Sequence, residues 1–534
     1  MSYAKARRPL GAQISHMLKD RGVDVIFGIP GVHNQEMYRG IEEAGITHVL
    51  ARHEQGAGFM ADGYARASGR PGVAYVITGP GVCNIMTPMG QAYSDSVPML
   101  VISSCLDDIA GKAGQLHQML DQEIAAGTVC DWSRTAPNAQ AAYQLVERAL
   151  DEFETARPRS KHIQVPIAVL MADADEPLSP NMPAARIRTS LPDVAAVASL
   201  LNIAQRPLFI LGGGAHSTLW RDLLSHLGAA AFTTYAGRGQ IAGAYPLNFG
   251  AALARPASAD VIASADLVIA VGTELAEVDL WREELGNSAT LVRVDIDPAC
   301  LSDRHRAQVK LLADATSFSA ALFKACEDQK PATGWNVDEV SAARARWRAE
   351  TDAERPGIVP ICDALQQVVP TNAMIYSDMT QFAYVAKEVW DMAQPGHWHH
   401  PYGFGTLGYA LPAGIGGAIA SKMGSSHAPT MVIVGDYGFH YTMQELGVAV
   451  ELGLPMAIIL WDNGKLKEIE DSMVRAQIAP NAVVARNPDF CKLAEAFGAY
   501  SAAPETLEDL QSAVRSAFAA DGPTLIYVTP AVIG

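Results

Sequence analysis

The chain has 534 residues, of which 49% are hydrophobic and 18% are charged, and its formal net charge is −17 at pH 7. This length exceeds one ordinary hydrophobic core, so roughly two to four domains are expected. The negative charge repels phosphate groups, which argues against nucleic acid or an anionic membrane as the main partner. The seven cysteines are scattered without a Cys-x-x-Cys pair, which indicates neither a disulfide framework nor a zinc site.

No uninterrupted apolar stretch reaches the length that spans a membrane, and no apolar run follows the basic residues near the N-terminus. We therefore expect a cytoplasmic protein without a transmembrane segment.

The first block, residues 1–175, alternates apolar runs with amphipathic stretches. Strands are expected at residues 23–29, 72–78 and 98–104, with helices between them. This alternation is typical of βα units around a parallel sheet. A proline-rich stretch follows and places a domain boundary near residues 172–192.

Two further blocks repeat the alternation. Residues 190–328 contain expected strands at 208–211, 266–272 and 290–297, and a polar, charged connector follows. Residues 355–534 contain expected strands at 373–378, 429–436, 455–463 and 523–530. The predicted fold class is therefore α/β, with three doubly wound parallel-sheet domains.

Polar residues follow two of the expected strands in the third block. Gly435-Asp436 ends one strand and Asp462-Asn463 ends the next, so both pairs should emerge at the carboxyl edge of one sheet. The Asp436 carboxylate, the Asn463 amide oxygen and the Lys465 backbone carbonyl suit Mg²⁺ that carries a diphosphate. Taken singly, each pair could also be a helix N-cap or a turn.

Together, the segment Gly435–Gly438 and Asn463 resemble the thiamine-diphosphate motif, in which Gly-Asp-Gly is followed after a similar interval by Asn-Asn. Two residues depart from the motif. Tyr437 stands where the family has the second glycine, and Asp462 replaces the first asparagine of the pair. A side chain at position 437 requires a negative φ there. The resemblance implies that Gly435, Asp436, Tyr437 and Gly438 contact the diphosphate and that the metal ligands are retained.

The first block resembles the pyrimidine-binding domain of the acetolactate synthase group, in the segment from Leu50 to Asn84. Glu54 matches the catalytic glutamate of that group, which hydrogen-bonds the aminopyrimidine and favours the tautomer that deprotonates the thiazolium C2. In this role Glu54 should be buried, whereas an ordinary acidic residue in a first helical turn is the alternative. Thr78 and Asn84, in the TGPGVCN segment, are implied to shape the cofactor cleft.

The third block also resembles the segments that hold the cofactor from the opposite side. In GFGTLGYALPAGIG, the Gly405 carbonyl and the Leu407 amide are implied to bind the pyrimidine, and the Leu407 side chain to bend the cofactor. In YSDMTQF, Thr380 and Gln381 open a helix whose N-terminal amides could bind the diphosphate.

The resemblance has consequences for assembly and for a second cofactor. In this family the pyrimidine domain of one chain faces the diphosphate domain of another, so Glu54 and Asp436 should meet across a subunit interface. A homodimer is therefore the minimum and a homotetramer is expected. Acetolactate synthases hold FAD in the central domain and related decarboxylases do not. The glycine-rich turn Gly212–Gly214 does not decide whether this chain binds FAD, and we favour its absence. The same turn lacks the complete glycine fingerprint of a nicotinamide dehydrogenase.

The implied chemistry is non-oxidative decarboxylation of a 2-oxo acid through a C2-ylide and an enamine. Protonation of the enamine gives an aldehyde, and capture by a second carbonyl compound gives the alternative, an acetolactate-synthase-type carboligase. A cofactor-free structural or regulatory paralogue is an alternative of another class, in which the altered turn at Tyr437 does not accept a diphosphate.

The substrate candidates lie in two loops of the first block and in one segment of the third. They are His33, His117, Asp121, Gln122 and Glu468. Acetolactate synthases have Phe-Gln-Glu where this chain has Asp121-Gln122-Glu123, and a carboxylate at Asp121 suits a guanidinium. This feature and the segment from Glu468 to Phe490 resemble the 5-guanidino-2-oxopentanoate decarboxylase branch. Lys465 and Lys467 favour an anionic substrate instead, or are solvated surface residues.

Overall fold

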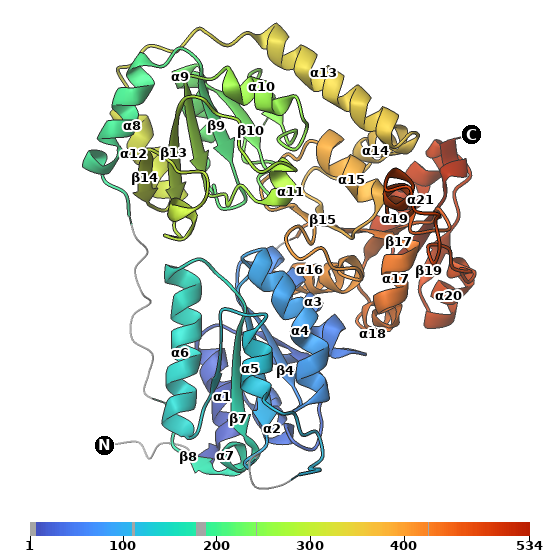
Figure 1. Ribbon diagram of the computed structural model, residues 1–534. Helices are drawn as coiled ribbons and strands as arrows, with labels where there is room; N and C mark the ends of the chain where they lie inside the picture. Colours follow the sequence, from blue (N-terminus) through green and yellow to red (C-terminus); the bar gives the residue numbers. More distant parts are fainter. Residues whose placement is uncertain (1–6, 109–112, 178–187, 242, 425–426, 534) are drawn as a thin grey trace.

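Three parallel sheets of six strands each form the molecule, one in each of the predicted blocks (Figure 1). The computed structural model describes residues 7–108, 113–177, 188–241, 243–424 and 427–533. A short antiparallel pair, β1 (Arg8–Pro9) with β8 (Asp173–Ala174), joins the two ends of the first block. The predicted α/β fold with three parallel-sheet domains is confirmed. Within the described residues, no helix is both long and apolar enough to cross a membrane.

The N-terminal sheet has the strand order β3-β2-β4-β5-β7-β6. Its strands are β2 (Val25–Gly28), β3 (Thr47–Leu50), β4 (Gly72–Val76), β5 (Met99–Cys105), β6 (Trp132–Thr135) and β7 (Lys161–Pro166). Its helices are α1 (Leu10–Asp20), α2 (Gln35–Glu43), α3 (Glu54–Ser68), α4 (Pro80–Ser94), α5 (Gln122–Gly127), α6 (Ala139–Thr155) and α7 (Ile167–Met171).

The central sheet has the order β11-β10-β9-β12-β13-β14. Its strands are β9 (Pro207–Leu211), β10 (Ala230–Thr233), β11 (Asn248–Gly250), β12 (Leu267–Val271), β13 (Thr290–Asp295) and β14 (Val309–Leu312). Its helices are α8 (Leu191–Ile203), α9 (Trp220–Leu227), α10 (Ser258–Ala263), α11 (Glu277–Leu280) and α12 (Ala315–Ala325), with a 3₁₀ turn at Cys300–Ser302. The polar connector forms α13 (Val337–Glu354), which packs Val340, Ala343 and Trp347 into the core beside this sheet.

The C-terminal sheet has the order β16-β15-β17-β18-β20-β19. Its strands are β15 (Met374–Ser377), β16 (Trp398–His399), β17 (Thr430–Gly435), β18 (Met456–Trp461), β19 (Tyr500–Ala502) and β20 (Pro523–Val528). Its helices are α14 (Ile358–Gln366), α15 (Gln381–Val389), α16 (Ala410–Lys422), α17 (Asp436–Thr442), α18 (Leu446–Glu451), α19 (Lys467–Arg475), α20 (Phe490–Phe497) and α21 (Leu507–Ala519), with 3₁₀ turns at Met443–Glu445 and Pro530–Ile533. Every residue of β17 and β18 is buried, as expected of central parallel strands with helices on both faces.

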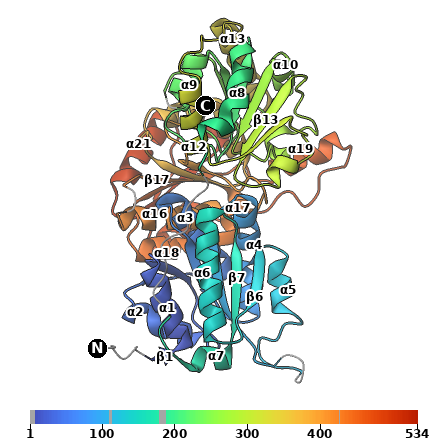
Figure 2. The same ribbon diagram turned by 90° about the vertical axis from the view of Figure 1, so that its left-hand side faces the viewer.

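Helix α3 of the N-terminal domain packs closely on α16 of the C-terminal domain (Figures 1 and 2). Glycines make this contact, because a Cβ on Gly63 would overlap the carbonyl of Ala413 and a Cβ on Gly416 would overlap that of Met60. Side chains at these positions would force the two helices apart. The contact fixes α3, and with it Glu54 at its start, relative to the C-terminal sheet.

Candidate active site

Two buried carboxylates lie at the carboxyl edge of the C-terminal sheet. Asp436 is the first residue of α17, directly after β17, and Asp462 follows β18, which pairs with β17. Burial raises the pKa of Asp436, and the nearby Asp462 carboxylate raises it further. Such a buried pair of like charges is stabilised by a divalent cation. The residues at this edge therefore fit the predicted metal.

The remaining predicted ligands follow Asp462 in the chain. The Asn463 Oδ1 accepts a hydrogen bond from the Lys465 backbone amide at 3.3 Å, so both residues belong to one tight turn. No cluster of three or more histidine, cysteine, aspartate or glutamate side chains suited to a metal occurs in the described ranges. The set of one carboxylate, one amide and one backbone carbonyl is consistent with that result, because only Asp436 belongs to those residue types.

Asp462, which departs from the family motif, organises this turn. Its Oδ1 accepts hydrogen bonds from the Gly464 amide at 2.7 Å and from Asn487 Nδ2 at 3.0 Å, and its Oδ2 accepts one from the Tyr527 hydroxyl at 2.9 Å. Three donors satisfy the buried carboxylate. Asp462 thus positions the chain that carries Asn463.

Asn487 was missed by the sequence reasoning. Its Nδ2 donates to Asp436 Oδ2 at 2.8 Å as well as to Asp462, and its Oδ1 lies 3.2 Å from His440 Nε2. One amide group therefore bridges both carboxylates. The only sequence signal at Asn487 was its position shortly before α20, and an asparagine before a helix is too common to indicate a functional site.

The altered turn at Tyr437 is accommodated by the helix that follows. Tyr437 lies in the first turn of α17 and is not among the residues with positive φ, as expected. The next residue, Gly438, has no room for a Cβ, because the Asp378 carboxylate packs against it. Burial raises the pKa of Asp378 to about 6. A Cβ at position 438 would therefore displace the Asp378 carboxylate, whereas position 437 accepts a side chain.

The predicted contacts of the C-terminal domain lie together. Asp378 Oδ2 accepts a hydrogen bond from the Gly408 amide at 2.9 Å, which joins the loop before α15 to the loop that carries Gly405 and Leu407. Thr380, the N-cap of α15, lies against Gly435, and Gln381 begins the helix. Gly405 is exposed with φ +65°, and Leu407 is partly exposed.

The predicted contacts of the N-terminal domain also lie together. Glu54 is the first residue of α3, its side chain is buried as expected, and its Oε2 accepts a hydrogen bond from Asn84 Nδ2 at 2.9 Å. Thr78 Oγ1 donates to Ser104 Oγ at 2.7 Å. The Thr78 hydroxyl is thus hydrogen-bonded within its own domain. The second carboxylate oxygen of Glu54, Oε1, lies beside Gly81 of α4.

Gln122 and Asp121 have structural partners. The Gln122 side chain is buried, its Oε1 accepts from the Gly79 amide, and its Nε2 donates to the Ser104 carbonyl and to Gln164 Oε1. Its amide therefore supports the TGPG loop and leaves no free donor for a substrate. Asp121 is the N-cap of α5 and is exposed, so its carboxylate remains open to solvent.

His33 and His117 lie in contact, although they come from different loops. Their ring centroids are 4.9 Å apart in an edge-to-face arrangement, and the buried Nδ1 of each ring lacks a hydrogen-bond partner. Burial lowers the pKa of His33, and the neighbouring His117 lowers it further. His117 has φ +63°, an unfavourable backbone conformation for a residue with a side chain. The structure thus brings two predicted substrate residues together.

The two lysines that favoured an anionic substrate are already paired. Lys465 Nζ lies 3.0 Å from both carboxylate oxygens of Glu470, and Lys467 pairs with Glu470 and Asp471. Their charges are therefore offset within their own segment. Glu468, the residue after Lys467, is paired instead with Arg355.

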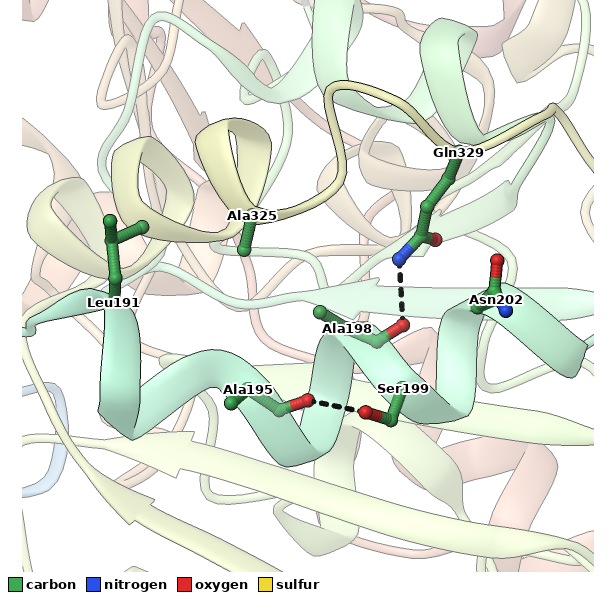
Figure 3. A pocket seen from close by; sticks show the side chains of 7 residues that line it. All are labelled: Leu191, Ala195, Ala198, Ser199, Asn202, Ala325 and Gln329. Atoms are coloured by element: carbon green, nitrogen blue, oxygen red, sulfur yellow. Dashed lines mark hydrogen bonds between the residues drawn. The ribbon is translucent and has the colours of Figure 1, made fainter.

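A pocket of about 440 Å³ lies beside α8 and α12 of the central domain, away from these groups (Figure 3). Gln329 Nε2 donates to the Ala198 carbonyl, and Ser199 Oγ donates to the Ala195 carbonyl. No ionisable side chain lines the pocket. It therefore offers no acid-base group.

Comparison with known proteins defines the class. The chain matches three parts of one family: the N-terminal thiamine pyrophosphate-binding domain over residues 8–125, the central domain over 194–322 and the C-terminal thiamine pyrophosphate-binding domain over 378–528. The chain therefore belongs to the thiamine pyrophosphate enzyme family. The resemblance inferred from the Gly435–Gly438 and Asn463 motif is confirmed.

Individual relatives resolve the family further. The chain is 43% identical to a probable 2-ketoarginine decarboxylase of Pseudomonas aeruginosa, over 97% of this chain and 93% of that protein. It is 27% identical to the acetolactate synthase isozyme 2 large subunit of Escherichia coli, over 97% and 95% of the two chains. It is 26% identical to the mitochondrial acetolactate synthase catalytic subunit of Saccharomyces cerevisiae, over 97% and 80%. The decarboxylase interpretation therefore has stronger support than the carboligase.

Proposed function

We propose that this protein catalyses the thiamine-diphosphate-dependent decarboxylation of 2-ketoarginine, that is 5-guanidino-2-oxopentanoate, to the corresponding aldehyde and carbon dioxide. The observation that carries the proposal is the 43% identity, along nearly the whole chain, to a probable 2-ketoarginine decarboxylase. The carboxylate, amide and backbone groups at the edge of the C-terminal sheet support it.

Each half of the site has a distinct task in this proposal. Asp436, Asn463 and the Lys465 carbonyl hold Mg²⁺, and the chain around Gly435, Gly438 and Thr380 holds the diphosphate. When bound, the cofactor would supply the electron sink for the bond that breaks, which joins the carboxylate carbon to the 2-oxo carbon. The Glu54 carboxyl group would hydrogen-bond the aminopyrimidine, and Asn84 orients that carboxyl group.

The proposal includes assembly and substrate contacts. Glu54 and Asn84 are hydrogen-bonded to each other within the N-terminal domain. As the family resemblance implies, a second copy of the chain would provide the diphosphate domain that faces them. We therefore propose a cytoplasmic homodimer, further assembled as a homotetramer. His33 and His117 contact the substrate carboxylate region and handle the proton that completes the aldehyde.

The test uses metal-stripped protein titrated with thiamine diphosphate and Mg²⁺ in a calorimeter, followed by carbon dioxide release from a panel of 2-oxo acids. The wild type should bind the cofactor and release carbon dioxide fastest from 5-guanidino-2-oxopentanoate. Preference for a shorter, uncharged 2-oxo acid would refute the proposed substrate. Absence of cofactor binding would instead favour the cofactor-free paralogue.

Product analysis separates the second candidate. A 2-hydroxy-2-methyl-3-oxo acid formed from pyruvate would identify an acetolactate-synthase-type carboligase, which the 26–27% identity to acetolactate synthases favours to a smaller degree. An aldehyde would identify the decarboxylase. The same reaction mixtures provide both measurements.

A further inference from the structure

A guanidinium group already binds an acidic side chain that contacts one of the predicted cofactor residues, Gln381. Arg355, the C-cap of α13, donates from Nη2 to both oxygens of Glu468 at 3.2 Å and from Nε to Glu468 Oε2 at 3.3 Å. The Arg355 guanidinium also lies over the ring of Tyr384, 5.7 Å from its centroid. A carboxylate and an aromatic face are the groups that bind guanidinium best.

This carboxylate lies beside the cofactor-binding edge. Gln381, the first residue of α15, donates from Nε2 to Glu468 Oε2 at 3.2 Å. Glu468 is also the second residue of α19, the helix that follows the turn of Asn463 and Lys465. A substrate bound next to the cofactor could therefore reach Glu468 with a side chain of several bonds.

The pair of Arg355 and Glu468 has features of an exchangeable contact. Its hydrogen bonds, at 3.2–3.3 Å, are longer than the roughly 2.7–2.9 Å of strong charge-assisted bonds. The two side chains are 20% and 33% exposed, so water competes for both groups. In addition, α19 buries none of its residues and lies at the periphery of the domain (Figure 2). Separating this pair should cost little free energy.

Within the segment around α19, neighbouring charges leave Glu468 as the available carboxylate. Lys465 and Lys467 pair with Glu470 and Asp471, as described above. Arg475 is mostly exposed and lies 3.9 Å from Glu468. The carboxylates on the first turn of α19 other than Glu468 are thus already matched with lysines of the same segment.

We propose that Glu468 is the specificity residue that binds the guanidinium of the substrate, in the place where the Arg355 guanidinium contacts it in the structure. The incoming guanidinium replaces Arg355 on Glu468, with the Tyr384 ring as a second contact. Arg355 turns towards Glu354, to which its Nη1 already donates at 3.3 Å. This inference rests on the proposed decarboxylation of a guanidino 2-oxo acid.

The test compares two substrates on the holoenzyme, 5-guanidino-2-oxopentanoate and the uncharged 2-oxohexanoate. Glu468→Gln should raise KM for the guanidino acid by roughly 10- to 100-fold, the effect of losing a hydrogen bond to a charged group. Its KM for 2-oxohexanoate should stay the same or fall. Arg355→Gln should lower KM for the guanidino acid by up to about 5-fold, since an exposed ion pair is worth little.

These opposite effects distinguish recognition from a structural contact. If the pair only joined α19 to the domain, both substitutions would impair both substrates in the same direction, and the inference would be overturned. Glu468→Asp should partly restore selectivity. As a matched control, Glu350→Gln removes a carboxylate from an exposed pair with Arg346 on α13 and should leave the selectivity ratio unchanged.

A binding measurement removes the dependence on turnover. The analogue 5-guanidinopentanoate lacks the 2-oxo group and cannot react, so calorimetry on the holoenzyme reports recognition alone. It should bind the wild type and lose affinity in Glu468→Gln, with cofactor binding retained. If the wild type releases no carbon dioxide from the guanidino acid, the proposed substrate is wrong and the inference falls with it. If the wild type does so and Glu468→Gln keeps the wild-type selectivity, only the inference is wrong.

Discussion

The C-terminal and central sheets have six parallel strands each, yet their carboxyl edges differ. At the C-terminal edge, the loops after β17 and β18 carry Asp436, Asp462 and Asn463, and side-chain groups join them. At the central edge, the loops after β9 and β12 join through their backbones: the Gly212 amide donates to the Val271 carbonyl and the Gly214 amide to the Gly272 carbonyl. The C-terminal edge thus presents carboxylate oxygens, whereas at the central edge these backbone amides are hydrogen-bonded to backbone carbonyls at the end of β12.

Ion pairs also cover the central edge. Arg157 and Arg159, from the loop before β7 of the N-terminal domain, pair with Glu274 and Asp297, which follow β12 and β13. These contacts join two domains across the place where many sheets of this type bind a nucleotide. The strand order thus provides a ligand-binding edge in each sheet, whereas the residues after the strands decide whether a ligand is bound.

The largest expected effect comes from Asp436. Asp436→Ala should abolish binding of Mg²⁺ with thiamine diphosphate and reduce carbon dioxide release to background, because Asp436 is the only carboxylate among the proposed metal ligands. The measurement is calorimetric titration of the metal-stripped protein. Asp462→Asn, which restores the residue of the family motif, is the matched control and should still bind. Equal loss in both variants would mean that charge alone, and not ligation by Asp436, holds the cofactor.

Asn487 should have a smaller effect at the same edge. Asn487→Ala removes the amide that bridges Asp436 and Asp462, and outer contacts of this kind typically change metal affinity by about 10- to 100-fold. The apparent Kd for Mg²⁺, measured at saturating thiamine diphosphate, should rise accordingly while thermal unfolding of the metal-free protein changes little. An unchanged Kd would show that Asn487 only packs the loop before α20.

Substitution at the central edge should affect stability but not cofactor binding. Gly272 has φ +57°, and a Cβ there would overlap the backbone of Gly214. Gly272→Ala should therefore destabilise the protein by at least roughly 1–2 kcal/mol, the cost of the left-handed conformation alone. Calorimetric melting should show this loss, and titration with thiamine diphosphate should show wild-type affinity. Gly424→Ala, also at positive φ but in open space, separates the conformational cost from the overlap.

The sequence alone predicted much of this difference. Buried runs such as those of β17 and β18 predicted parallel strands, and strand ends predicted that Asp436 and Asn463 would share an edge. Asn487 could not be predicted, because its partners lie far away in sequence and a single asparagine in a loop carries no periodic signal. The structural use of Gln122 was hidden for the same reason, since its partners Gly79, Ser104 and Gln164 meet it only in the folded domain.

The smallest expected effect concerns FAD. Because the Gly212, Gly214 and Gly272 amides donate to backbone carbonyls, they cannot also bind the phosphates of a dinucleotide. We therefore expect the purified protein to lack flavin absorbance and added FAD to leave the melting temperature unchanged, whereas thiamine diphosphate with Mg²⁺ should raise it. A rise with FAD alone would mean that the loops after β9 and β12 separate in solution. The two edges would then differ in the ligand that they bind and not in the ability to bind one.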